Sequence, residues 1–134
     1  MIKSQIPNPK NQINSKHQKL KVYDLEERTY KFAQTIGNFC QNLPRSITNI
    51  EYGRQLIRSA GSVGANYIEA NEALGKKDFL MRIKICRKEA KESAYWLRLI
   101  ISTNKNQVEI DDNKLLQEAI ELKKIFSTIL QNSQ

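Results

Sequence analysis

The chain has 134 residues and a formal net charge of +8, and 40% of its residues are hydrophobic. This length suffices for one domain with a core of its own and is short for two. The sequence has no apolar run of about eighteen residues and no apolar segment near its start, which argues against a membrane span and a signal peptide. We therefore expect a cytoplasmic protein without a membrane partner.

The first part of the chain differs from the rest in composition. Residues 1–23 contain five lysines and no acidic residue, together with Pro7 and Pro9, and they show no apolar period. We predict a basic N-terminal arm over residues 1–21 and a single domain over residues 22–134. A charge run of this kind can attract nucleic acid, and it can also simply be solvated.

The rest of the chain has the apolar spacing of helices. Asp24, with an acidic residue three positions later, resembles a capping box, so a first helix is predicted to begin there and to end before Pro44. Its apolar residues are Leu25, Phe32, Ile36, Phe39 and Leu43. Thr48 repeats the start signal, and a second helix is predicted from there to about Leu74, ahead of a glycine that breaks it.

Two further helices are predicted in the second half of the chain. One runs from about Lys76 to Thr103, and the other begins at Asp111 or Asp112. The apolar face of the last helix consists of Leu115, Ala119, Leu122, Phe126 and Ile129. Because short links favour antiparallel neighbours, we predict an all-α fold, an antiparallel up-down-up-down four-helix bundle.

The stretch RSAGSVGANYIE, residues 58–69, has two interpretations. Its glycines could bind a phosphate, but a P-loop requires a lysine and a hydroxyl residue directly after the last glycine, and Gly64 precedes Ala65 and Asn66. On a helix, one arc of about 140° collects Gly53, Leu56, Ile57, Ala60, Val63, Gly64, Tyr67 and Ile68. We predict that this arc is the buried face, and that its small residues let another helix approach closely.

Four segments of the chain resemble a known family: DLEERTYKFA, LPRSI, QLIRSAGSVGANYIEA and KDFLMRIKICRKEAKESAYWLRLI. They are similar to the bacterial four-helix-bundle family named after a protein encoded in intervening sequences of 23S ribosomal RNA genes. The resemblance covers about residues 22–101 and implies a bundle that assembles into a homo-pentamer, with no established activity. At fold level only, the chain also resembles the accessory protein of diversity-generating retroelements, a basic pentameric bundle that works with a reverse transcriptase and nucleic acid.

The predicted third helix has two apolar sides. A core stripe consists of Phe79, Ile83, Cys86, Ala90, Ala94, Leu97 and Ile101. A second apolar cluster, on another side, consists of Met81, Ile85, Trp96 and Leu99. A small monomer needs one apolar stripe per helix, so the second apolar cluster predicts a subunit interface anchored by the tryptophan. The alternative is that Trp96 lies in a groove of its own bundle.

A third side of this helix is basic. The basic stripe, as we call it, consists of Lys77, Lys84, Arg87, Lys88, Lys91 and Arg98, with Tyr95 among them and no acidic residue. Repeated around a ring of subunits, it would bind nucleic-acid phosphates in a salt-dependent way and without reading the base sequence. The alternative is a solvated helix face, some of it paired with the acidic fourth helix.

The sequence predicts no catalytic residue, no metal site and no cofactor. His17 is the single histidine and lies in the arm, which argues against multi-histidine zinc sites, di-iron pairs and nucleophile triads. Cys40 and Cys86 lie within apolar patterns and are predicted to be core residues. Ion pairs with arginines such as Arg58 are the expected role of the glutamates Glu69, Glu72, Glu89 and Glu92.

From the sequence we therefore expect a non-enzymatic, homo-oligomeric four-helix-bundle scaffold, pentameric by its family resemblance. It is expected to bind RNA or DNA phosphates through the basic stripe. The alternative is a protein–protein adaptor whose basic face binds an acidic partner. A third hypothesis is a hydrolase with a site between subunits.

Overall fold

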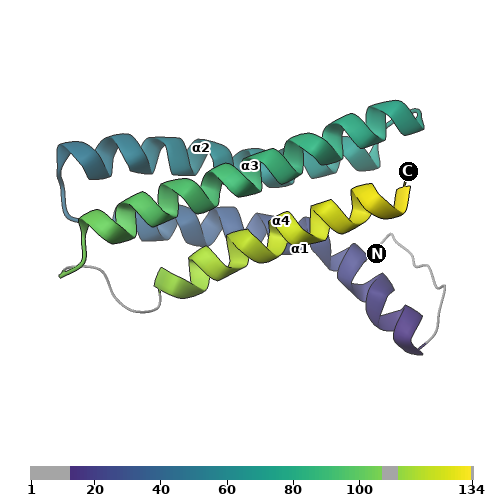
Figure 1. Ribbon diagram of the computed structural model, residues 1–134, viewed down its shortest axis with the longest axis horizontal. Coiled ribbons are helices and arrows are strands. Elements are labelled where there is room, and N and C mark those ends of the chain that lie inside the picture. The colour runs from purple at the N-terminus through teal and green to yellow at the C-terminus, as the bar shows by residue number, and fades with distance from the viewer. Residues whose placement is uncertain (1–12, 107–111, 134) are drawn as a thin grey trace.

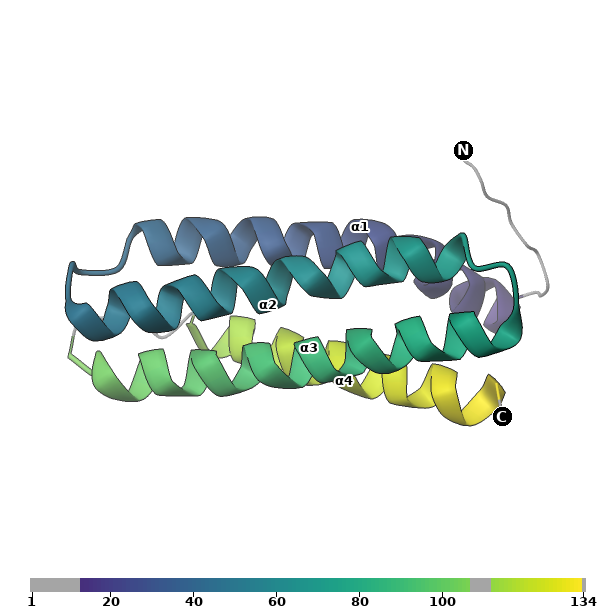
Figure 2. The ribbon, with the colours of Figure 1, turned by 90° about the horizontal axis from the view of Figure 1, so that it is seen from above.

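Four α-helices make up the part of the chain that the structure describes. The computed structural model describes residues 13–106 and 112–133. The helices are α1 (Ile13–Gln41), α2 (Ile47–Asn71), α3 (Lys76–Thr103) and α4 (Asp112–Ser133). Successive helices run in opposite directions, and α2 packs against both α1 and α3 (Figures 1 and 2). The predicted all-α four-helix bundle is confirmed.

The helix boundaries match the prediction for α3 and α4 and differ for α1. Helix α1 begins at Ile13, well ahead of the predicted start at Asp24, so that prediction was wrong. Residues 13–23 lack an apolar period, but they include lysines and a glutamine, whose helix propensity is close to that of alanine. Of the predicted arm, residues 1–12 lie outside the described residues, and residues 13–21 belong to α1.

The start of α2 also differs slightly from the prediction. The Oγ of Ser46 accepts a hydrogen bond from the backbone N–H of Asn49 at 3.1 Å. Ser46 has the extended backbone of an N-cap residue, with φ −159° and ψ 162°, so it takes the capping role that the sequence suggested for Thr48. At its other end α2 stops at Asn71, three residues before the predicted end at Leu74.

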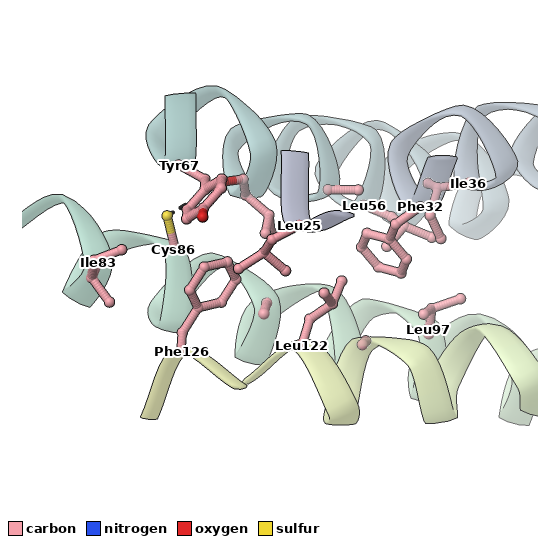
Figure 3. Packing of buried hydrophobic residues seen from close by; sticks show 14 of the residues in the cluster. Leu25, Phe32, Ile36, Leu56, Tyr67, Ile83, Cys86, Leu97, Leu122 and Phe126 are labelled. Carbon is pink, nitrogen blue, oxygen red and sulfur yellow. Dashed lines mark hydrogen bonds between the residues drawn. The ribbon is translucent and has the colours of Figure 1, made fainter. Parts of the chain in front are cut away.

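The core is one apolar cluster to which all four helices contribute. Its fully buried members include Ile36, Leu56, Ala60, Val63, Ile83, Cys86, Leu97, Ile100, Leu122 and Phe126. In Figure 3 the ring of Phe126 lies near Leu25 and Tyr67, and the ring centroids of Phe126 and Tyr67 are 5.9 Å apart. The core residues predicted for α1 and α4 are all buried or packed against this cluster.

On α3 the core stripe is rotated relative to the prediction. Phe79, Ala94 and Ile101 are only half-buried, whereas Ile100, which was not assigned to the stripe, is fully buried. The reason is that α3 packs more extensively against α2 than against α4, so its buried side turns toward α2.

The glycines of α2 bring it close to α1. A Cβ built on Gly64 would lie 2.9 Å from Thr29 Oγ1, and one on Gly53 would lie 3.6 Å from the nearest α1 side chain. The predicted close approach of another helix is confirmed. The predicted arc was wrong at its edge, however, because Ile57 and Ile68 are each 50% exposed. Since α1 meets α2 at the glycines, these isoleucines extend past α1 into solvent.

Candidate nucleic-acid interface

Arg58 of α2 binds two carboxylates of α3. Its Nη2 donates to Glu92 Oε1 at 2.6 Å and lies 3.3 Å from Glu89 Oε1. The side chain of Glu89 is only 10% exposed, a position in which an unpaired charge would be costly. Two of the three acidic residues of α3 are therefore paired with Arg58 on the side that faces α2, as the sequence led us to expect.

Arg28 of α1 holds the two glutamates of α4. Its Nε and Nη2 donate to the carboxylate of Glu118 at 2.7 and 2.8 Å, and Nη2 lies 3.9 Å from Glu121. Both glutamates are thus directed toward α1. Among the described residues, neither pairs with the basic stripe, so the alternative in which α4 neutralises that stripe is not found there.

All six residues of the basic stripe are exposed on α3. Within the described part of the chain, none of them forms an ion pair. Intervals of seven residues separate Lys77, Lys84, Lys91 and Arg98. At 1.5 Å per residue this row of cations is about 32 Å long. The basic stripe is therefore a continuous, uncompensated line of positive charge along the bundle.

The second apolar cluster is partly used within the chain. Met81 is 51% exposed, whereas Ile85, Trp96 and Leu99 are half-buried. The ring of Trp96 lies 6.0 Å, centroid to centroid, from that of Tyr52 on α2, and its Nε1 is buried without a hydrogen-bond partner among the described residues. Trp96 thus packs against its own bundle on one side, while Met81 is left in solvent.

The sequence analysis missed a further apolar surface on α2. Ile50, Ile57 and Ile68 are about half-exposed, and Gly61 lies between them at spacings of four and seven residues, on the same side of the helix. A Cβ built on Gly61 meets nothing within 4 Å. A glycine inside a helix costs about 1 kcal/mol relative to alanine, and no packing within the described residues offsets that cost here. We call these four residues the α2 apolar face.

Side-chain hydrogen bonds hold the helices in register. Asn49 of α2 and Asn104 at the end of α3 exchange amide hydrogen bonds of 2.9 and 2.8 Å, and both are buried. Arg82 of α3 donates to the side-chain carbonyl of Asn66 on α2 at 2.9 Å. These bonds fix α3 against α2, so the basic stripe lies on a rigid support.

The two cysteines and the possible metal ligands of the described residues can be examined directly. Burial raises the pKa of the Cys40 thiol to about 11 and that of Cys86 to about 12, so both are protonated and weakly nucleophilic at neutral pH. Among the described side chains, no three His, Cys, Asp or Glu residues are grouped so that they could hold a metal ion. The side chain of His17 lies outside those described. None of the described helices has the length and apolarity to cross a membrane.

Comparison with known proteins places the chain in a family. Residues 18–128 match the family described as 23S rRNA-intervening sequence protein. The chain belongs to this family. The match extends into α4, for which the sequence offered no resemblance to quote. A protein of unknown function from the S23 ribosomal protein family of Bacteroides thetaiotaomicron VPI-5482 has a similar solved structure, with 27% identity, a TM-score of 0.68 and coverage of 78% of this chain and 96% of that one. No curated protein matches.

Proposed function

We propose that this member of the 23S rRNA-intervening sequence protein family is a non-enzymatic, homo-oligomeric scaffold that binds nucleic-acid phosphates through the basic stripe. The similar solved structure is of a protein of unknown function, so the proposal rests on the chain itself. The observation that carries it is the separation of charge on α3. The six cations of the basic stripe face solvent, while Glu89 and Glu92 are paired with Arg58 on another side.

This separation leaves a strong positive field at the surface of α3. Residues 76–105 contain nine basic and three acidic residues, a net charge of +6. The glutamates of α4 bind Arg28 and so do not reduce this field locally. A strand of duplex nucleic acid carries one phosphate per about 3.4 Å, so a row of cations of about 32 Å spans about nine phosphates.

The proposal predicts a steep dependence of affinity on salt. Neutralising six phosphates gives a slope of log K against log salt of about −5 for a duplex and about −4 for a single strand. Between about 50 and 200 mM salt, the affinity for a duplex should therefore fall about 1,000-fold. Contacts to phosphates alone carry no base sequence information, so the affinity should depend little on sequence.

Two separate apolar surfaces on one protomer support assembly. The α2 apolar face lies on the side of α2 next to α1, and the second apolar cluster lies on its other side, where Trp96 contacts Tyr52. Two unlike surfaces favour head-to-tail contacts, which close into a ring when the rotation between subunits permits. Five subunits is the number that the family resemblance implies. A ring repeats the basic stripe once per subunit, which raises the avidity for a long nucleic acid.

Fluorescence anisotropy with labelled RNA and DNA across a salt series tests the proposal. One variant replaces Lys84, Arg87 and Lys91 with glutamine. A matched control replaces three exposed cations outside the basic stripe, and so loses the same net charge: Lys31, Arg45 and Lys124. We expect the stripe variant to lose roughly half of the salt slope, because half of its phosphate contacts are gone, and the control to keep most of it.

Three outcomes contradict the proposal. Equal losses in the two variants would mean that net charge matters and the basic stripe does not. If neither nucleic acid binds at low salt, the phosphate-binding role fails, and an acidic protein partner becomes the hypothesis to test. If light scattering at micromolar concentration shows a monomer, the protein is not an oligomeric scaffold.

A further inference from the structure

A groove between α3 and α4 continues the basic stripe toward the end of α3. Its volume is about 340 Å³, which lies within the range of small-ligand sites. The residues that form it come from α3, from the turn after it and from α4, and include Tyr95, Arg98, Leu99, Ser102, Lys105 and Leu116. Arg98 belongs to the basic stripe, so the groove and the stripe form one surface.

The groove combines an apolar wall, two cations and an exposed aromatic ring. Leu99 and Leu116 are half-buried, and Arg98 and Lys105 are exposed. Tyr95 is 52% exposed, so about half of its side chain is accessible to a ligand. This set of groups suits a ligand that has a flat, weakly polar part and a negative charge close beside it.

Tyr95 is aligned with the cations and held in place. It follows Lys91 by four residues and precedes Arg98 by three, which places it on the same side of α3. Its ring makes a T-shaped contact with Trp96, with centroids 5.1 Å apart and planes at 71°, and Trp96 in turn contacts Tyr52. A ring that is already restrained loses little conformational entropy when a ligand stacks on it.

No carboxylate lies among the residues that form the groove. The glutamates of α4 bind Arg28 on the far side of that helix. Lys123 follows Leu116 by seven residues, so it lies on the same side of α4 and adds a further cation near the groove. Glu92 precedes Tyr95 by three residues and is paired with Arg58; the residues that form the groove carry only positive charges and so favour an anionic ligand.

We infer that this groove binds an unpaired nucleobase stacked on Tyr95, while Arg98 and Lys105 bind the neighbouring phosphates. The inference rests on the proposed function and specifies its ligand, which is single-stranded nucleic acid. In a duplex the faces of the bases are covered by their neighbours, whereas an unpaired base offers its face to an aromatic ring. Stacking acts on every base, so it adds affinity without sequence preference.

The test uses the full chain and fluorescence anisotropy at one fixed, low salt concentration. The probes are labelled oligo(U), oligo(dT), a duplex of the same length, and an abasic oligonucleotide that has the same phosphates and no bases. The variant is Tyr95→Ala. Tyr95→Phe keeps a ring at this position, and Tyr30→Ala removes a 60% exposed tyrosine on α1 as the matched control. Circular dichroism checks that each variant retains its helices.

We expect Tyr95→Ala to weaken binding of the single strands by about 5-fold to about 150-fold, the range that corresponds to the loss of one stacked base. Binding of the duplex and of the abasic strand should change little, because neither offers a base to the ring. Tyr95→Phe and Tyr30→Ala should behave like the wild type. The comparison of oligo(U) with oligo(dT) distinguishes RNA from DNA as the preferred ligand.

The outcomes separate this inference from the proposed function. Equal affinity of the wild type for the abasic strand and for oligo(dT) would refute stacking and leave phosphate binding intact. The same holds if Tyr95→Ala has no effect, or if it weakens all four probes equally. If no probe binds even at low salt, both the inference and the proposed function are wrong.

Discussion

Replacing Gly64 with alanine tests the packing of α2 against α1. The added Cβ would lie 2.9 Å from Thr29 Oγ1 and 3.2 Å from Thr29 Cβ, closer than side chains tolerate. Thr29 cannot turn away easily, because it is buried and its hydroxyl donates to Leu25 O at 2.8 Å and lies 3.0 Å from Glu26 O. Either the threonine or the helix must therefore shift.

Two costs and one gain set the expected change in the free energy of unfolding. Overpacking a close contact costs about 1–3 kcal/mol, and a disturbed buried hydrogen bond costs about 0.5–1.5 kcal/mol. Alanine in place of glycine in a helix returns about 1 kcal/mol. The clash outweighs the helix propensity, so we expect Gly64→Ala to lower the free energy of unfolding by about 1–3 kcal/mol.

Gly61→Ala is the matched control, because it makes the same chemical change one turn earlier on α2. A Cβ there meets nothing within 4 Å in its own chain, so at concentrations at which the assembly is dissociated only the gain in helix propensity remains, and stability should rise by about 0.5–1 kcal/mol. Urea unfolding followed by circular dichroism measures both changes. The double variant Thr29→Ala, Gly64→Ala should recover part of the loss, since it removes the clashing hydroxyl.

The two variants must therefore change stability in opposite directions. If Gly64→Ala stabilises the chain as much as Gly61→Ala does, α1 does not approach α2 at that point, and the packing described here is wrong. A loss that Thr29→Ala does not relieve would show that the strain lies elsewhere.

Three further predictions concern other parts of the bundle. Trp96→Ala should lower the mass of the assembly in light scattering with the helical content unchanged, and an unchanged mass would exclude Trp96 from the interface. Asn49→Ala removes the donor to the buried Oδ1 of Asn104, whose Nδ2 still donates to Ile100 O, so urea unfolding should show a loss of about 1–3 kcal/mol, and no loss would contradict the reciprocal pair. Burial raises the pKa of both thiols above the ordinary 9.0, so the unfolded chain loses these protons at a lower pH than the folded chain does. The free energy of unfolding should therefore fall as the pH rises from about 9 toward 11. This fall should be smaller in the variant Cys40→Ala, Cys86→Ala, and an equal fall would contradict the assignment to the thiols.

The sequence predicted the helices best where strong signals stand at both ends. α3 begins directly after Gly75 and ends before a polar run, and its predicted bounds are those observed. The start of α1 was missed because a pattern of Asp24 and Glu27 resembles a cap wherever it occurs, including the interior of a helix. Such a pattern indicates a start only if the preceding residues are poor helix formers, and here they are not.

The faces of the helices were harder to predict than their bounds. A helical wheel shows which residues share a side, but it does not show how much of that side a neighbouring helix covers. On α2, α1 covers the side as far as Gly53 and Gly64 and leaves Ile57 and Ile68 beyond its edge. The sequence predicted that Glu89 and Glu92 would pair with an arginine such as Arg58. It could not show that this pairing lies on the side of α3 that faces α2 and leaves the basic stripe without acidic neighbours in solvent.

The α2 apolar face contains two features that the described bundle does not explain, half-exposed isoleucines and a helical glycine with open space around it. A second copy of the chain packed on this face would account for both. If a second copy covers the exposed half of Ile57, the free energy of association becomes more favourable by about 1 kcal/mol per subunit contact. This corresponds to about a five-fold change in the association constant. We therefore expect Ile57→Ser to shift light scattering at low micromolar concentration toward smaller species. The free energy of unfolding of the Ile57→Ser variant should change little under conditions that already dissociate the assembly, since Ile57 lies outside the core. If the mass is unchanged while the stability falls by several kcal/mol, Ile57 is buried within its own chain, and the face is not an interface.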